Sequence, residues 1–158
     1  GRNGLIDLAS ALCGSYIAAW NDAHFGKPQN LLLPGVGERM EDGWETRRRR
    51  EPGSDWVIVA LGRPGTVERI EIDTSQFKGN YPDMASLQAA YLPGMDDKAA
   101  VPLSLYWSEL LPPQKLGPHR NHTYKAEIAA AGPVTHLRFN IFPDGGVNRL
   151  RVFGRPAE

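Results

Sequence analysis

Hydrophobic and polar residues alternate most clearly near the carboxyl-terminal end of the chain. Between Thr135 and Phe142, Leu, Phe and Ile stand at positions 137, 139 and 141, and His, Arg and Asn stand at positions 136, 138 and 140. A period of two places the apolar side chains on one face of a β-strand and the polar ones on the other. We therefore predict a strand with one face in the core and one face available for chemistry.

A second alternating segment, Arg149 to Phe153, follows after a short turn sequence. The intervening Pro143-Asp144-Gly145-Gly146 has the residue types of a tight turn. Two strands joined by such a turn commonly form a hairpin. We therefore predict that these two strands pair with each other.

Glycine and proline divide the rest of the chain into short segments. The 17 glycines and 13 prolines are spread evenly and leave little room for long helices. Strand signals lie between these breaks, and the further predicted strands are Tyr16–Trp20, Trp56–Leu61, Val67–Thr74, Ser86–Tyr91 and Thr123–Ile128. Leu5–Leu12 is a possible short helix. Seven or eight strands predict an all-β fold, a β-sandwich.

Length and charge narrow the class of protein. A chain of 158 residues suits one domain, here residues 1–158, and no apolar run approaches the roughly 20 residues that a membrane helix needs. The 18 Lys and Arg residues balance 18 Asp and Glu residues, which argues against nucleic acid or a membrane as partner. The single cysteine, Cys13, favours a reducing, cytoplasmic setting.

The densest polar stretch contains four consecutive arginines. It runs Asp42-Gly43-Trp44-Glu45-Thr46-Arg47-Arg48-Arg49-Arg50 and is followed by Asp55. A pocket for a carboxylate or ureido ligand would give the arginines partners of matching forked geometry. A solvated basic turn, or a strand whose arginines pair with acidic neighbours, explains the pattern about equally well.

A second polar stretch, Asp73 to Asp83, follows a predicted strand and contains Lys78 and Asn80. A loop of this kind at the rim of a sandwich is a natural binding edge. The alternative is a capped turn in which Asp73 and Asn80 satisfy backbone amides.

Three histidines are candidates for acid–base chemistry or for metal binding. His119 and His122 flank Arg120-Asn121, and His136 lies on the polar face of its strand. Imidazole titrates near neutrality, which suits proton transfer. The spacing of His119 and His122 matches no known metal motif, so the metal stays unknown and structural histidines remain the alternative.

The order and spacing of these segments resemble the allantoicase family, in particular the second of its two homologous repeats. The resemblance covers nearly the whole chain and rests on segments that include Asn21-Asp22-Ala23-His24-Phe25-Gly26, Asp42 to Arg50, Phe77-Lys78-Gly79-Asn80 and Asn140-Ile141-Phe142-Pro143-Asp144-Gly145-Gly146. It implies a jelly-roll sandwich similar to galactose-binding domains. It also implies a hydrolase of linear amidine-type C–N bonds that converts allantoate and water into ureidoglycolate and urea.

Allantoate carries one carboxylate and two ureido groups, which suggests roles for the polar residues. The predicted catalytic residues are His136, His119, His122 and Glu45, and the predicted substrate-binding residues are Arg47, Arg48, Asp73, Lys78, Asn80 and Asn140. A histidine would act as general acid or base. We predict no cofactor, with a divalent metal as the alternative.

Two other functions remain compatible with the sequence. Similar sandwiches bind small ligands without catalysis, and a single repeat can serve chiefly as a structural partner. Because family subunits usually carry two repeats, the resemblance implies a second allantoicase repeat or a homo-oligomer as partner.

Overall fold

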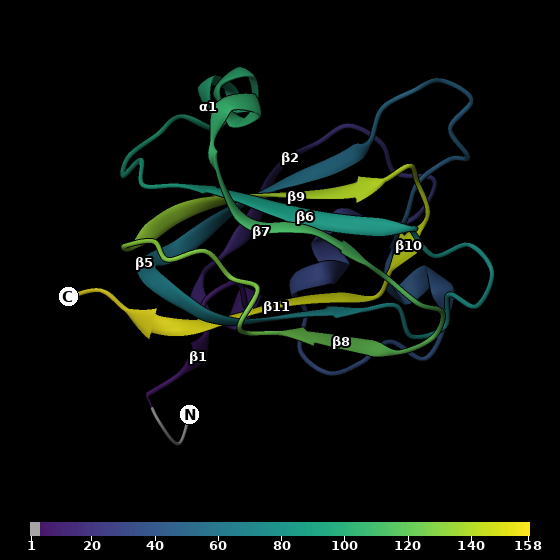
Figure 1. The fold of residues 1–158 in the computed structure, drawn as a ribbon, viewed down its shortest axis with the longest axis horizontal. Helices are drawn as coiled ribbons and strands as arrows, with labels where there is room; N and C mark the ends of the chain where they lie inside the picture. The colour runs from purple at the N-terminus through teal and green to yellow at the C-terminus, as the bar shows by residue number, and fades with distance from the viewer. Residues whose placement is uncertain (1–3) are drawn as a thin grey trace.

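The longest strand, β5 (Asp55–Asp73), runs through both layers of a β-sandwich in the computed structural model, which describes residues 4–158 (Figure 1). Its first part pairs with β2 (Tyr16–Trp20) and β9 (Val134–Phe142), and its second part pairs with β8 (Asn121–Tyr124) and β11 (Arg149–Pro156). The pairing with β9 shifts register between Ala60 and Gly65. The strand therefore changes layers at this irregularity.

The other strands extend the two layers. β6 (Met84–Ala90) and β7 (Ser108–Lys115) continue the layer of β9, and β1 (Ile6–Asp7) continues the layer of β11. A small separate sheet has the order β10-β4-β3, and its strands are β3 (Phe25–Gly26), β4 (Trp44–Glu45) and β10 (Gly146–Val147). The short helices are η1 (Ala11–Cys13), η2 (Pro28–Leu32), η3 (Met40–Asp42), α1 (Asp97–Leu103) and η4 (Ser104–Tyr106).

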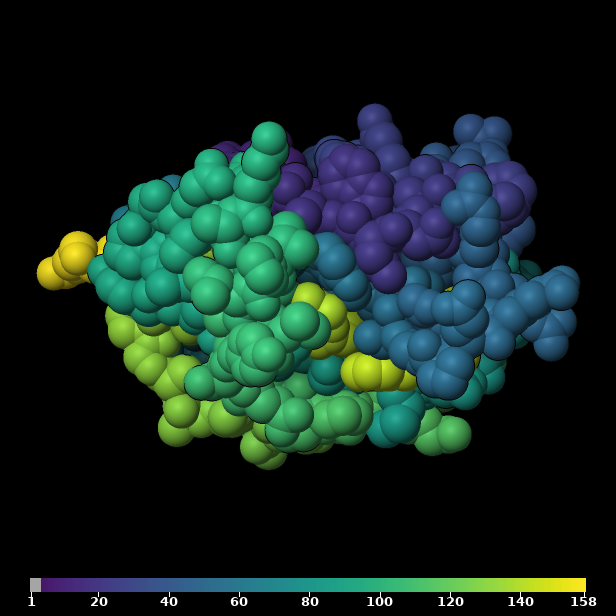
Figure 2. All heavy atoms as spheres, turned by 90° about the horizontal axis from the view of Figure 1, so that it is seen from above, coloured from purple at the N-terminus to yellow at the C-terminus, as the bar shows by residue number. Residues whose placement is uncertain are grey.

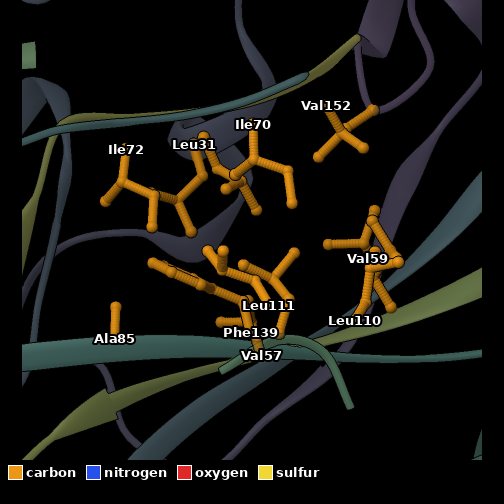
Figure 3. Packing of buried hydrophobic residues seen from close by; sticks show 14 of the residues in the cluster. Leu31, Val57, Val59, Ile70, Ile72, Ala85, Leu110, Leu111, Phe139 and Val152 are labelled. Atoms are coloured by element: carbon orange, nitrogen blue, oxygen red, sulfur yellow. The ribbon is translucent and has the colours of Figure 1, made fainter. Parts of the chain in front are cut away.

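The core lies between the layers. Ile70, Ile72 and Val152 from one layer face Val57 and Phe139 from the other (Figure 3), and all five side chains are buried. Burying an apolar side chain of this size contributes about 1.5–3 kcal/mol. The predicted all-β sandwich is confirmed.

The alternation in β9 is confirmed, but its polar face is largely covered and opens only in part. Leu137 and Phe139 belong to the core, while His136 and Arg138 on the other face are also buried. The segment of α1 and η4 covers this face, since Ser104 Oγ accepts a hydrogen bond from Arg138. The helix α1 was not predicted, because it contains Pro102 and a proline in a helix interior is usually unfavourable.

The predicted hairpin is wrong. β9 pairs with β5 and β6, whereas β11 pairs with β5 and β1, so the two strands do not pair with each other. The residues after Phe142 instead cross from one layer to the other, and β10 pairs with β4 on the way. A turn sequence between two alternating segments therefore does not show that the two strands pair with each other.

The remaining sequence predictions hold to different degrees. Tyr16–Trp20 is a strand with the predicted bounds, whereas the segment predicted as Thr123–Ile128 is a strand only over Asn121–Tyr124. The possible helix at Leu5–Leu12 is wrong, because β1 and η1 occupy this segment. β7 was not predicted, since it contains two prolines, which an edge strand tolerates. Within residues 4–158, no helix has the length and apolar character to cross a membrane.

Candidate functional site

A polar cleft of about 590 Å³ lies where the arginine segment, the loop after β5 and the turn before β10 meet. Its volume falls in the usual range for small-molecule sites, about 300–1,000 Å³. The side chains that give it charge are Glu45, Arg48, Arg49, Asp83 and Asp144, and Asn80 and Tyr81 add polar groups. Three of the predicted site residues, Glu45, Arg48 and Asn80, therefore come together in this cleft.

Glu45 is positioned by its neighbour in β4. Trp44 is fully buried, contacts the ring of Phe139 in the core, and donates a hydrogen bond from Nε1 to the carbonyl of Asp22 at 2.9 Å. Because successive side chains of a strand point to opposite faces, burial of Trp44 turns Glu45 away from the core. Glu45 is only half-buried and lines the cleft.

Asn80 is held opposite Glu45 by two glycines. The N–H of Gly146 donates to the Asn80 carbonyl at 2.8 Å, and a Cβ at Gly145 would lie 2.9 Å from the same oxygen. Close approach of two backbones requires such positions to lack a side chain. The Asn80 Nδ2 atom donates a hydrogen bond to Glu45 Oε2, which fixes the carboxylate on the cleft wall.

The first three of the four arginines have different surroundings. Arg47 is paired with Asp22 at 2.7 Å, and Arg49 lies 3.5 Å from the buried Asp55. Arg48 forms no ion pair or hydrogen bond within residues 4–158, although it lines the cleft and an adjacent hollow of about 280 Å³. Its guanidinium therefore keeps all of its donors for a ligand.

The backbone of the arginine segment is also tied to the cleft. The N–H of Arg49 donates to Asp144 Oδ2 at 2.7 Å, and the N–H of Arg47 donates to Asp22 Oδ2 at 2.7 Å. These two carboxylates hold the backbone on either side of Arg48. The paired-arginine interpretation thus applies to Arg47 and Arg49, and the ligand interpretation fits Arg48.

Asp73 and Lys78 do not enter the cleft. Asp73 is buried at the end of β5, and its Oδ1 accepts the N–H of Ser75 at 2.8 Å, as in the capped-turn alternative. Lys78 is exposed on the loop after β5 and is absent from the cleft wall.

His119 and His122 lie behind this loop, where both rings contact the backbone. His119 Nδ1 accepts the N–H of Gln76 at 2.8 Å. His122 Nε2 accepts the N–H of Gly117 at 2.8 Å, and its Nδ1 lies 2.8 Å from the carbonyl of Ile72. These two contacts occupy both ring nitrogens of His122 and fix the orientation of its ring. Neither histidine lines the cleft.

His136 and Asn140 lie on the outer face of β9. His136 is buried beside Trp107, with ring centroids 5.9 Å apart, and burial lowers the pKa of its imidazole below the ordinary value of 6.5. Asn140 donates to Gln88 Oε1 at 3.0 Å and accepts from Arg138. The cleft therefore does not include either residue.

A sequence profile described as allantoicase repeat matches residues 6–157. The chain belongs to the allantoicase family. The repeat is 58% identical over 155 residues to a probable allantoicase of Stutzerimonas stutzeri, covering 98% of this chain and 47% of that protein. It is 56% identical to a probable allantoicase of Pseudomonas fluorescens, covering 100% of this chain and 48% of that protein.

Solved structures agree with this family and with the fold. The crystal structure of allantoicase from Saccharomyces cerevisiae matches with a TM-score of 0.82 and 39% identity, over 95% of this chain and 43% of that chain. A fucolectin from striped bass serum matches with a TM-score of 0.68 at 9% identity, over 97% of this chain and 48% of that chain, and supports the fold alone. The predicted jelly-roll sandwich is confirmed. The allantoicase repeat described here spans about half the length of the curated relatives it matches.

Four residues that line the cleft of this allantoicase repeat are not identified by any pattern in its sequence. Asp144 belongs to a predicted turn, and Tyr81, Asp83 and Arg49 carry no signal that separates them from their neighbours. Their placement depends on the contact between the glycine turn and the loop after β5, which no local pattern encodes. Within residues 4–158, no three His, Cys, Asp or Glu side chains are grouped so that they could hold a metal ion.

Proposed function

We propose that this chain carries a site for the hydrolysis of allantoate to ureidoglycolate and urea, the cleavage of a linear amidine-type C–N bond. The observation that carries the proposal is an unpaired arginine, Arg48, in one cleft with the hydrogen-bonded pair Glu45 and Asn80, in a chain that belongs to the allantoicase family.

In this proposal Arg48 binds the carboxylate of the substrate. A guanidinium whose donors are all free can form two parallel hydrogen bonds to a carboxylate. Arg47 is paired with Asp22 and is the weaker candidate for this role. The carboxylates of Asp83 and Asp144 accept hydrogen bonds, and they suit the N–H groups of the two ureido arms.

Glu45 supplies the proton transfer. In the overall reaction a water oxygen bonds to the central carbon of allantoate, the bond from that carbon to one ureido nitrogen breaks, and the proton lost by water ends on the departing urea. In this proposal Glu45 accepts the proton from water and returns it to the urea nitrogen, a role worth roughly 10²–10⁴-fold in rate. The three histidines lie outside the cleft, which favours Glu45 among the four predicted catalytic residues.

The partner of the site is a further part of the proposal. Relatives are about twice as long as this chain, which covers 47% of the Stutzerimonas stutzeri protein. A cleft open at its rim can be closed by a neighbouring domain, which would exclude water from the reaction. We propose that a second allantoicase repeat, or another copy of this chain, lies beside it.

The test is release of urea from allantoate by this chain, with the Saccharomyces cerevisiae allantoicase as a positive control. Glu45→Gln keeps an oxygen that accepts the hydrogen bond of Asn80 but cannot transfer the proton, so kcat should fall roughly 10²–10⁴-fold. Glu51→Gln makes the same change on the wall of the adjacent hollow, outside the cleft, and should leave kcat unchanged. Full turnover by a folded Glu45→Gln variant would remove Glu45 from the mechanism.

A further inference from the structure

A second hollow, of about 310 Å³, lies on the outer face of the layer formed by β5, β9 and β6. Its floor includes Arg138 and Asn140 of β9 and Ser86 and Gln88 of β6, and Glu109 of β7 lies on its wall. In Figure 2 the yellow-green segment near residue 140 is visible between the green segment of α1 and β7 and the blue segment near residue 50. None of these five residues lines the cleft of Glu45 and Arg48.

Arg138 is a buried cation without an anionic partner. It is 6% exposed, and its ring contact is with Trp56, at 4.6 Å from the guanidinium carbon to the ring centroid. Its Nε donates to Asn140 Oδ1 at 2.9 Å and its Nη1 to Ser104 Oγ at 2.8 Å, and both of these acceptors are neutral. Within residues 4–158, no carboxylate forms an ion pair with Arg138.

Burial of this charge is costly unless something compensates it. Neutral hydrogen-bond acceptors and an aromatic ring replace the hydration of a buried cation only in part, because no opposite charge lies beside it. Burial accordingly lowers the pKa of the Arg138 guanidinium below its ordinary value. An anion in the hollow would compensate the charge that burial deprives of water.

Two donors of the hollow remain free for such an anion. Arg138 Nη2 has no hydrogen-bond partner within residues 4–158 and is not among the buried atoms sealed from solvent. Ser86 Oγ accepts a hydrogen bond from Asn140 at 3.3 Å, and its own hydroxyl proton has no acceptor among the described residues. Gln88 fixes this arrangement, because it accepts from Asn140 at 3.0 Å and donates to the carbonyl of Trp107 at 3.0 Å.

Glu109 favours a ligand that carries only one negative charge. Its side chain is exposed and lines the same hollow, so a phosphate or another multiply charged anion would be repelled more strongly than a single carboxylate. Nη2 of Arg138 and the hydroxyl of Ser86 supply one free donor each, which suits the two oxygens of a single carboxylate.

We propose that the hollow over Arg138 is a second binding site, separate from the cleft, and that it takes a single carboxylate group. The carboxylate belongs to a small carboxylic acid or to an Asp or Glu side chain of another copy of the chain. Either source supplies the missing anionic partner of Arg138, and the two sources are distinguished by their dependence on protein concentration.

The experiment follows the Arg138 Nε–H signal by nitrogen-15 NMR, assigned by its loss in Arg138→Met. Sodium acetate is the probe, and sodium chloride at the same ionic strength is the control. Acetate should shift the signal saturably and chloride should not. Ser86→Ala should weaken acetate binding severalfold, whereas Arg48→Met, which removes the free arginine of the cleft, should leave it unchanged.

Dilution of the protein without acetate identifies the second source. A signal that changes on dilution and reverts on addition of acetate would assign the carboxylate to another copy of the chain, which also supports the site. A signal that neither acetate nor dilution moves, in a folded protein, would overturn the proposal. Arg138 would then serve only to tie η4 to the sheet, and Arg138→Met would affect stability alone.

Discussion

Substitution of Gly146 by alanine tests how the fold places the two sides of the cleft. Gly146 pairs with Glu45 across β10 and β4, and its N–H donates to the carbonyl of Asn80 at 2.8 Å. A Cβ at this position would lie 2.0 Å from Cε1 and 2.1 Å from Cδ1 of Phe77, which is fully buried. The added methyl group therefore requires the Phe77 ring or the turn to move.

The expected cost follows from this overlap. Carbon atoms in contact prefer separations of about 3.5–4.0 Å, so one partner must shift by roughly 1.5 Å or more. Overpacking of this kind costs about 1–3 kcal/mol. For a domain of this size the melting temperature then falls by roughly 2–12 °C. Because the displaced turn also carries the contact to Asn80, urea release should fall along with stability.

Thermal denaturation of four variants measures the effect. Gly79→Ala is the matched control, since nothing lies within 4 Å of its added Cβ, and its free energy of unfolding should change by no more than about 0.5 kcal/mol. Phe77→Leu gives the added methyl group room. The double variant Gly146→Ala/Phe77→Leu should recover about 0.5–3 kcal/mol relative to the sum of the single variants.

Two results would refute this reasoning. Equal stability of Gly146→Ala and Gly79→Ala would mean that the turn and the Phe77 ring are not in close contact. If the effects of Gly146→Ala and Phe77→Leu on the free energy of unfolding were strictly additive, the cost of Gly146→Ala would not arise from contact with the Phe77 ring.

Three further predictions concern the core, a buried histidine and the cleft. Phe139→Ala empties a fully buried position and should lower the free energy of unfolding by about 3–5 kcal/mol in urea denaturation. Since burial lowers the pKa of His136, the unfolded chain binds the proton more readily, so stability should be lost as the pH falls from 6.5 toward the folded pKa; His136→Gln should flatten this slope, and an unchanged slope would contradict the assignment. Asn80→Ala removes the hydrogen bond to Glu45 and should lower kcat for urea release about tenfold, whereas an unchanged kcat would mean that Glu45 is oriented by other groups.

The fold was predictable from the sequence where a strand has one apolar face. The alternation in β9 identified its core side chains, because Leu137 and Phe139 pack between the layers. Strand pairing was not predictable in the same way. β9 and β11 are consecutive long strands, yet each pairs with a different part of β5, because the irregularity near Gly65 takes β5 across the sandwich.

The candidate site was predictable only in part, for a similar reason. Glu45 and Arg48 belong to one short polar segment, whereas Asp144 reaches them through contacts between distant segments. The histidines stood out because imidazole is chemically versatile. Their surroundings instead favour structural roles. The backbone occupies both ring nitrogens of His122, and His136 lies beneath Trp107.

Calorimetric titration of allantoate tests the central claim that the cleft of Arg48 is its binding site. The Glu45→Gln background prevents consumption of the ligand during the measurement. Arg48→Met should weaken binding about tenfold or more, because a charge-assisted hydrogen bond is worth about 1.5–3 kcal/mol. Arg50→Met removes the same charge from the same segment but outside the cleft, and should change the affinity by no more than about fivefold. Equal affinities of the Arg48→Met and Arg50→Met variants, or no binding of allantoate by the folded parent, would contradict the account.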